Sequence, residues 1–199
     1  MCGPVAGLLL TGGRSSRMGF DKALLPVGGA PNATRLAAAL AGVASPVIEV
    51  GPGFSGLRPV QEEPRGAGPL LAVCAGVSAL GRLGHEGPVL VVACDMPFVT
   101  GRILRALADF PGSSSVVPCP NGRPQPLCAR WAAADLALGA ELAATGARAM
   151  KALLSKASFV HFTEDFWPSG VVAGDFADVD TPEDRLRLGL AGPGDLTRP

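Results

Sequence analysis

A short apolar run near the start of the chain, residues 5–10, ends close to a pair of glycines, Gly12 and Gly13. A run of this length without alternating polar residues is typical of a strand buried on both faces of a sheet. Glycines just after such a strand let the main chain turn sharply and approach a ligand closely. This feature predicts a buried strand that feeds a glycine loop, and the rest of the fold must be built around it.

Segments with the apolar spacing of strands and helices alternate along the rest of the chain. Strands are expected at residues 47–50, 88–93, 115–118, 127–131 and 159–162. Helices are expected at 33–41, 70–80, 132–138 and 147–157, after Thr100 as far as residue 110, and from Thr181-Pro182 onward, with a glycine and proline loop at 51–59. This alternation predicts a three-layer, Rossmann-like α/β fold with a mostly parallel central sheet. Ligands of such sheets bind at the carboxyl ends of the strands.

Length and composition indicate a single globular domain. A chain of 199 residues suits one domain, here residues 1–190, followed by a flexible tail at 191–199. No apolar run is long enough to cross a bilayer and the start has no basic leader, so we expect a cytoplasmic protein. The 17 basic and 17 acidic residues balance, which argues against nucleic acid or a membrane surface as a partner. The five cysteines lack zinc-site spacing, so reduced thiols are expected.

The loop after the first strand combines the two glycines with two cations, Arg17 and Lys22. The main-chain N–H groups of Gly12 and Gly13, together with these side chains, would suit phosphate oxygens. The loop lacks the Gly-Lys-Ser/Thr of a Walker A motif and the G-x-G-x-x-G of a dinucleotide site, which argues against a dehydrogenase. An ordinary turn with solvated cations is the alternative interpretation.

Three carboxylates stand where a divalent cation could bind beside a triphosphate. Asp95 directly follows a buried apolar run, where an aspartate is rare without a partner or a metal. Asp178 and Asp180 lie two residues apart and share one face of an extended segment, from which they could offer a second ligand. The alternatives are a turn aspartate before Pro97 and a helix cap next to Thr181.

From residue 12 to residue 26 the chain reads G-G-x-S-x-R-M-G-x-D-K-x-L-L-P, which resembles the signature of the MobA-like nucleotidyltransferases. Similar segments follow in order over nearly the whole chain: Gly66-Ala67-Gly68-Pro69-Leu70, Cys94-Asp95-Met96-Pro97, Gly122-Arg123-Pro124-Gln125-Pro126-Leu127 and Asp178-Val179-Asp180-Thr181-Pro182-Glu183-Asp184. Several ordered matches are more specific than any single one. The resemblance implies the fold of the nucleotide-diphospho-sugar transferases and Mg²⁺-dependent transfer of a nucleoside monophosphate from a triphosphate.

The resemblance also implies roles for individual residues. Arg17, Lys22 and Asp95 are implied to be catalytic, and Asp95, with Asp180 as a second ligand, is implied to hold Mg²⁺. The implied nucleotide-binding residues are Leu10, Thr11, Gly12, Gly13, Arg17, Lys22, Glu63 and Asp95. An ionised acceptor phosphate needs no protein nucleophile, so we expect catalysis by alignment and charge neutralisation.

The pair Gly12-Gly13 resembles the guanine-using branch of the family. This implies transfer of GMP from GTP to the terminal phosphate of the molybdopterin-bound molybdenum cofactor, with transient contacts to cofactor-handling proteins. The chain departs from the family pattern at Thr11, which replaces a usual alanine, and at Val50, Asp178 and Asp180, which replace usual asparagines. Molybdopterin cytidylyl transfer, sugar-phosphate nucleotidyl transfer and non-catalytic nucleotide binding are therefore the alternatives.

The loop that contains Gln125 lies between two arginines, Arg123 and Arg130. Both would suit an anionic acceptor, although arginines beside a turn are usually only solvated. His85 and His161 have no cysteine or acid at a ligand-like interval, so we expect surface histidines.

Overall fold

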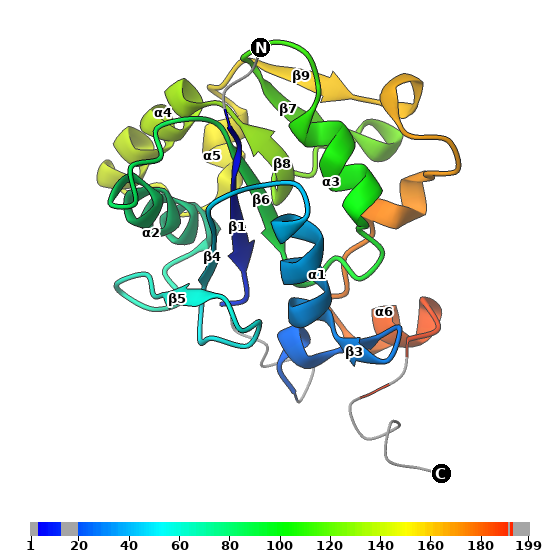
Figure 1. The fold of residues 1–199 in the computed structure, drawn as a ribbon. Coiled ribbons are helices and arrows are strands. Elements are labelled where there is room, and N and C mark those ends of the chain that lie inside the picture. Colours follow the sequence, from blue (N-terminus) through cyan, green and yellow to red (C-terminus); the bar gives the residue numbers. More distant parts are fainter. Residues whose placement is uncertain (1–3, 13–19, 191, 193–199) are drawn as a thin grey trace.

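The computed structural model describes residues 4–12, 20–190 and 192, which form a seven-stranded sheet between two layers of helices (Figure 1). In spatial order the strands are β5 (Arg58–Val60), β4 (Val47–Val50), β1 (Ala6–Leu10), β6 (Val89–Ala93), β8 (Cys128–Trp131), β7 (Ser115–Pro118) and β9 (Phe159–Phe162). β1 pairs in parallel with β4 and β6, whereas β8 is antiparallel to its neighbours β6 and β7. The predicted mostly parallel sheet is confirmed.

Helices cover both faces of the sheet. On one face lie α1 (Asn32–Ala41) and α3 (Gly101–Ala108), and on the other lie α2 (Pro69–Gly81), α4 (Ala133–Ala144) and α5 (Met150–Leu154) (Figure 1). The side chains of β1 alternate between the two layers: Leu9 belongs to the core beside α1 and α3, and Leu8 and Leu10 belong to the other core. Because successive side chains of a strand point to opposite faces, an uninterrupted apolar run is what a strand covered on both sides requires.

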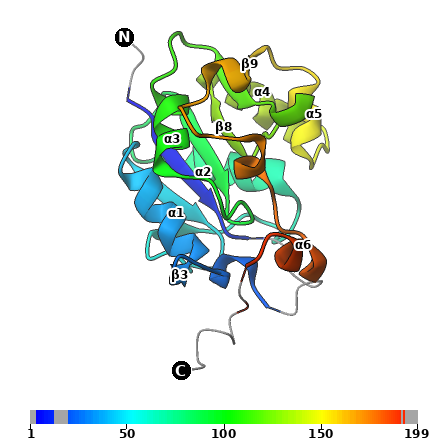
Figure 2. The same cartoon turned by 90° about the vertical axis from the view of Figure 1, so that its right-hand side faces the viewer.

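The carboxyl ends of β1 and β6 lie at one edge of the sheet, and later parts of the chain return to it. Helix α6 (Pro182–Arg187) lies at this end of the molecule, as does the hairpin of β2 (Pro26–Val27) and β3 (Ala30–Pro31) (Figures 1 and 2). Short 3-10 helices span Lys22–Leu24, Pro120–Gly122, Glu164–Phe166 and Ala173–Phe176. Segments far apart in sequence therefore meet at the edge where ligands of parallel sheets bind.

The structure differs from the predicted elements mainly at their ends and at the sheet edge. Residues 58–60 form β5 although a loop is predicted through residue 59, because the segment pairs with the edge of β4. Pro59 is compatible with an edge strand, where its missing N–H is not needed. Helix α4 runs beyond the predicted residue 138, and α5 is shorter than the predicted 147–157. Local patterns also do not predict the β2–β3 hairpin.

Two expectations concern features outside the fold itself. Among the described residues, no helix combines the length and the apolarity that a membrane crossing requires. The cysteines that the structure describes, Cys74, Cys94, Cys119 and Cys128, are free thiols. The tail predicted at 191–199 lies outside the described residues, except for Gly192.

Candidate active site

A cavity of about 330 Å³ opens at the carboxyl ends of β1 and β6. This volume is at the lower end of the range of small-molecule sites. The lining residues are Leu10, Thr11, Gly12, Lys22, Glu62, Gly66, Gly68, Pro69, Ala72, Ala93, Cys94, Asp95 and Leu127. The structure therefore brings together five of the residues predicted to bind nucleotide, namely Leu10, Thr11, Gly12, Lys22 and Asp95.

The end of β1 is bonded to β4 through its main chain. The N–H groups of Thr11 and Gly12 both donate to the Val50 carbonyl, at 3.0 and 3.2 Å. The pairing with β4 therefore continues two residues past β1 and engages the Gly12 N–H, whose role as a phosphate donor stays a prediction. Gly13 and Arg17, the other predicted contacts of this loop, lie outside the described residues.

Asp95 lies two residues past the end of β6 and is partly buried on the cavity wall. Burial raises the pKa of its carboxyl to about 6; Lys22 acts in the opposite direction, and repulsion by Asp180 and Asp178 adds to the rise. Three carboxylates therefore influence one another at this side of the cavity, with Lys22 as the cation that offsets them. Ionisation of Asp95 is favoured by any additional cation placed beside it.

Two side chains of α1 hold the loop that carries Asp95. The buried Asn32 donates through Nδ2 to the carbonyl of the residue before Asp95, at 2.8 Å. Arg35 donates to Asn32 Oδ1 at 2.9 Å and to the carbonyls of Pro97 and Val99 at 2.8 and 2.6 Å. Sequence reasoning did not identify these positioning residues. A polar residue at the start of an otherwise apolar helix face is the signal that could have found Asn32.

The segment that contains Asp178 and Asp180 is bonded to the main chain of Asp95. The Val179 N–H donates to the Asp95 carbonyl at 2.8 Å. Val179 is buried and the two flanking aspartates are exposed, so both carboxylates lie on one side of an extended segment, as predicted. This attachment explains why both of them raise the pKa of Asp95.

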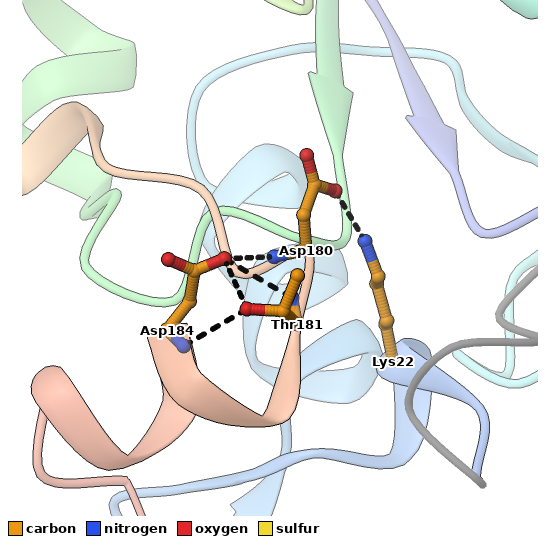
Figure 3. A network of polar contacts seen from close by, with 4 residues as sticks. All are labelled: Lys22, Asp180, Thr181 and Asp184. Carbon is orange, nitrogen blue, oxygen red and sulfur yellow. Dashed lines mark hydrogen bonds and ion pairs between the residues drawn. The ribbon is translucent and has the colours of Figure 1, made fainter.

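Helix α6 fixes the position of Asp180 (Figure 3). Thr181 caps this helix as predicted, because its hydroxyl oxygen accepts from the Asp184 N–H at 3.1 Å. The Asp184 carboxylate in turn accepts from the Thr181 hydroxyl at 2.9 Å and from the N–H groups of Asp180 and Thr181 at 3.2 and 3.1 Å. The Asp180 carboxylate turns away from this cap and accepts from Lys22 Nζ at 2.5 Å (Figure 3).

The acidic side chain near Gly12 belongs to Glu62 and not to Glu63. Glu62 is 7% exposed, and its Oε1 accepts from the Gly66 N–H at 2.9 Å. It lines the cavity and also a neighbouring one. Glu63 is exposed and is not among the lining residues of either. Glu63 lies in a bend with its side chain exposed, so the acidic side chain that the structure places at the cavity is Glu62 and not the predicted Glu63.

Arg130 is a structural residue, which corrects its predicted role as an acceptor contact. Its side chain is fully buried. It donates to the carbonyls of Ala108, Phe110, Gly112 and Ser114, at distances of 3.2, 2.6, 3.0 and 2.9 Å. These bonds fasten the turn between α3 and β7. Arg123, by contrast, is exposed, and its predicted acceptor role stays a prediction.

Neither histidine is among the residues that line the cavity. His161 is exposed and stacks on Phe159, with ring centroids 4.9 Å apart. His85 is partly buried, and its Nε2 lies 3.0 Å from the Pro88 carbonyl oxygen. His161 is therefore the surface histidine that was expected, whereas His85 differs from the expectation because it is partly buried beside Pro88.

Asp95 is a carboxylate that lines the cavity, and Asp180 lies near it, on Lys22. In the part of the chain that the structure describes, no group of three or more His, Cys, Asp or Glu side chains could hold a metal ion. Mg²⁺ is commonly bound through one or two carboxylates, with substrate phosphates and water as the other ligands. The repulsion that raises the pKa of Asp95 is relieved by a divalent cation. The donor set therefore fits a magnesium ion that shares its coordination with a triphosphate.

A three-layer α/β fold with a cavity at the strand ends defines the class of Rossmann-like proteins. A family model described as the MobA-like NTP transferase domain matches residues 7–159. The chain therefore belongs to the MobA-like NTP transferase family, as its motifs indicate.

Individual relatives agree with this assignment. The chain is 38% identical over 130 residues to a probable molybdenum cofactor guanylyltransferase of Pelotomaculum thermopropionicum, a match that covers 62% of this chain and 61% of that protein. It is 30% identical over 189 residues to the molybdenum cofactor guanylyltransferase of Rhodobacter capsulatus, covering 92% and 94%. The crystal structure of molybdopterin-guanine dinucleotide biosynthesis protein A from Archaeoglobus fulgidus superposes with a TM-score of 0.73 at 20% identity, covering 92% and 95%. This last comparison confirms the fold.

Proposed function

We propose that this protein is a cytoplasmic enzyme that transfers GMP from GTP to the terminal phosphate of the molybdopterin-bound molybdenum cofactor and releases pyrophosphate. The observation that carries the proposal is the cavity at the strand ends, where Lys22, Glu62 and Asp95 converge in a member of this family. Two relatives named as molybdenum cofactor guanylyltransferases support guanine as the base and this cofactor as the acceptor.

The reaction requires alignment and charge neutralisation more than covalent chemistry by the protein. An ionised oxygen of the acceptor phosphate forms the new bond to the α-phosphorus of GTP, and the bond to the bridging oxygen of the leaving pyrophosphate breaks. Negative charge increases on the phosphate oxygens during this exchange. Lys22, which lines the cavity, is placed to offset that charge.

Mg²⁺ is the metal that we propose for this site, with Asp95 as its main protein ligand and Asp180 as the second. When bound, it neutralises charge on the triphosphate and the leaving pyrophosphate. Lys22 contacts Oδ1 of Asp180 and also lowers the pKa of Asp95, which of the two aspartates is the one that lines the cavity. The same arrangement brings Lys22 close to both proposed ligands.

Glu62 gives a physical basis for the choice of guanine. A carboxylate only accepts hydrogen bonds, and guanine presents two adjacent donors, N1–H and the N2 amino group, on one edge. Cytosine presents one amino group beside the unprotonated N3, which repels a carboxylate. Glu62 is buried on a wall shared by two cavities, where loss of the matching donors is costly. We therefore propose that Glu62 reads the base.

A panel of four nucleoside triphosphates tests the proposal. Each is mixed with Mg²⁺ and molybdopterin-bound cofactor, and pyrophosphate release is measured. We expect release with GTP. Release with CTP instead would identify a cytidylyltransferase, and release only when a sugar phosphate replaces the cofactor would identify a sugar-phosphate nucleotidyltransferase. Saturable GTP binding without release would identify a non-catalytic nucleotide-binding protein.

A further inference from the structure

A buried carboxylate in β4 accepts hydrogen bonds from five donors. Glu49 is 0% exposed, and its Oε1 accepts from the Thr11 hydroxyl and from the N–H groups of Gly53 and Phe54, both at 2.8 Å. Its Oε2 accepts from the Ser55 N–H at 2.9 Å and from the Ser55 hydroxyl at 2.5 Å. Burial on its own raises the pKa of Glu49, but the bonds from Ser55, Thr11 and Phe54 bring it below the usual value. The carboxylate is therefore charged at neutral pH.

This network joins two segments that meet at the candidate active site. Thr11 lies just after β1 and lines the cavity, whereas residues 53–55 belong to the loop between β4 and β5. The two segments are in close contact at Gly51, where an added Cβ would lie 2.2 Å from Thr11 Oγ1 and 2.6 Å from the Gly12 nitrogen. Because close-packed segments transmit displacements, a shift of the loop must move Thr11 and Gly12.

The same loop also forms part of the second cavity, whose volume is about 220 Å³. Gly51 and Pro52 line this cavity, and Gly12, Glu62 and Gly66 line both cavities. The two cavities are therefore neighbouring parts of one site. The loop that Glu49 holds is a wall of that site.

We propose that Glu49 is a positioning residue that sets the nucleotide-binding wall by holding residues 51–55 against Thr11. The inference rests on the proposed nucleotidyl transfer and adds to it a residue that lines neither cavity. The inference gives a reason for the presence of a hydroxyl group at Thr11 and of a glutamate within the otherwise apolar strand β4. Val50, at the end of β4, is buried in the core, so β4 acts on the site through its main chain and the following loop.

The test measures GTP affinity by calorimetry in the presence of Mg²⁺. Thr11→Val keeps the shape of threonine but removes one donor to Glu49, and we expect GTP binding to weaken about tenfold. Thr11→Ser keeps the hydroxyl and should restore most of the GTP affinity that Thr11→Val loses. Ser55→Ala removes a donor from a residue that lines neither cavity, and it should weaken GTP binding in the same direction.

Ser115→Ala is the matched control. Ser115 is buried and donates to Asp135 at 2.5 Å, so it too is part of a hydroxyl–carboxylate pair. Ser115 is the first residue of β7. Because β6 and β7 are both antiparallel to β8, they run in the same direction. Ser115 therefore lies at the amino ends of these strands, whereas the cavity lies at the carboxyl end of β6. Ser115→Ala should lower the melting temperature, as Ser55→Ala does, and leave GTP affinity unchanged.

A double-mutant cycle separates positioning from direct contact between Thr11 and the nucleotide. In a protein that already carries Glu49→Gln, which breaks the network, Thr11→Val should weaken GTP binding by less than about twofold. If Glu49→Gln does not fold, Thr11→Val is combined with Ser55→Ala instead. A tenfold loss that persists in that background overturns the inference, as does wild-type GTP affinity in both Thr11→Val and Ser55→Ala. These outcomes leave the proposed function intact. Absence of GTP binding by the wild type overturns both.

Discussion

The two sides of the cavity are built in opposite ways. On the side of β4, which we term the buried wall, Glu49, Thr11 and Ser55 are at most 9% exposed and are joined by a hydrogen-bond network. On the side of α6, which we term the exposed wall, Asp178 and Asp180 are exposed, and Asp180 forms an ion pair with Lys22. One wall is therefore fixed by buried polar contacts and the other by contacts that water can reach.

This difference indicates that the walls have different tasks. Buried, fully bonded networks are strengthened by their low-dielectric surroundings and favour one geometry. Ion pairs with exposed partners contribute only about 0–1 kcal/mol, so Lys22 and Asp180 can change partners at low cost. We infer that the buried wall positions the nucleotide and that the exposed wall adapts when phosphates and a cation arrive.

The largest expected effect is at Asp95, which lines the cavity and is influenced by the charged groups of the exposed wall. Asp95→Asn keeps the size of the side chain and removes its charge. We expect turnover to fall about a thousandfold or more in a pyrophosphate-release assay, because charge neutralisation is lost. Asp109→Asn, at the exposed end of α3, is the matched control and should leave turnover unchanged. Near-normal turnover of Asp95→Asn would remove Asp95 from the proposed metal site.

The next effect concerns how pH changes stability through Asp95. Its pKa is raised to about 6, mainly by burial, so the folded state binds this proton more tightly than the unfolded chain does. The free energy of unfolding should therefore fall as pH rises from about 4 to about 6, by at most about 3 kcal/mol for this group. Asp95→Asn does not have this titrating group. The free energy of unfolding of the variant minus that of the wild type, measured with urea in the absence of metal, should therefore increase over that pH range and then level off. A constant difference would mean an ordinary pKa.

The fold could be predicted because its signals are local. Apolar runs at β1 and β6 are uninterrupted, since both faces of these strands are covered, and Thr181-Pro182 marks the start of α6 wherever that helix lies. The edge strand β5 was missed because it depends on pairing with β4, which no local pattern records. Arg130 was misassigned for the same reason: the turn whose carbonyls surround it lies 16 to 22 residues away in sequence.

The two walls also differ in how far sequence could predict them. Lys22, Asp95 and Asp180 are charged residues in recognisable motifs, so their meeting could be expected. The choice of Glu62 over Glu63 depends on how the loop at these residues bends, and this is fixed by contacts such as the bond from the Gly66 N–H to Glu62. Glu49 gives no motif at all, because its importance comes from donors that the fold places around it. The exposed wall was therefore predictable, whereas of the buried wall only Thr11 was predicted.

A smaller effect is expected at Lys22, where a substitution tests whether the exposed wall contributes less to stability than the buried wall does. Lys22→Ala should weaken GTP binding about tenfold, because a cation near the phosphates is lost. It should change the free energy of unfolding by less than about 1 kcal/mol, because its partner Asp180 is exposed. Calorimetry and thermal melting measure the two quantities, with Lys151→Ala on the exposed side of α5 as the control. A large loss of stability would show that the exposed wall is as rigid as the buried one.

The smallest effect is expected at Thr181, which supports Asp180 from behind the ion pair. Thr181→Ala removes the helix cap of α6 and should lower stability by about 1 kcal/mol, while Thr181→Ser should restore it. GTP affinity should change less than in Thr11→Val, because the Val179 N–H still ties this segment to Asp95. The hydroxyls of Thr11 and Thr181 each donate to a carboxylate, so the pair of variants compares one kind of bond in the two walls. Equal losses of GTP affinity in both would mean that positioning is shared by the walls and that burial does not decide which of them holds the nucleotide.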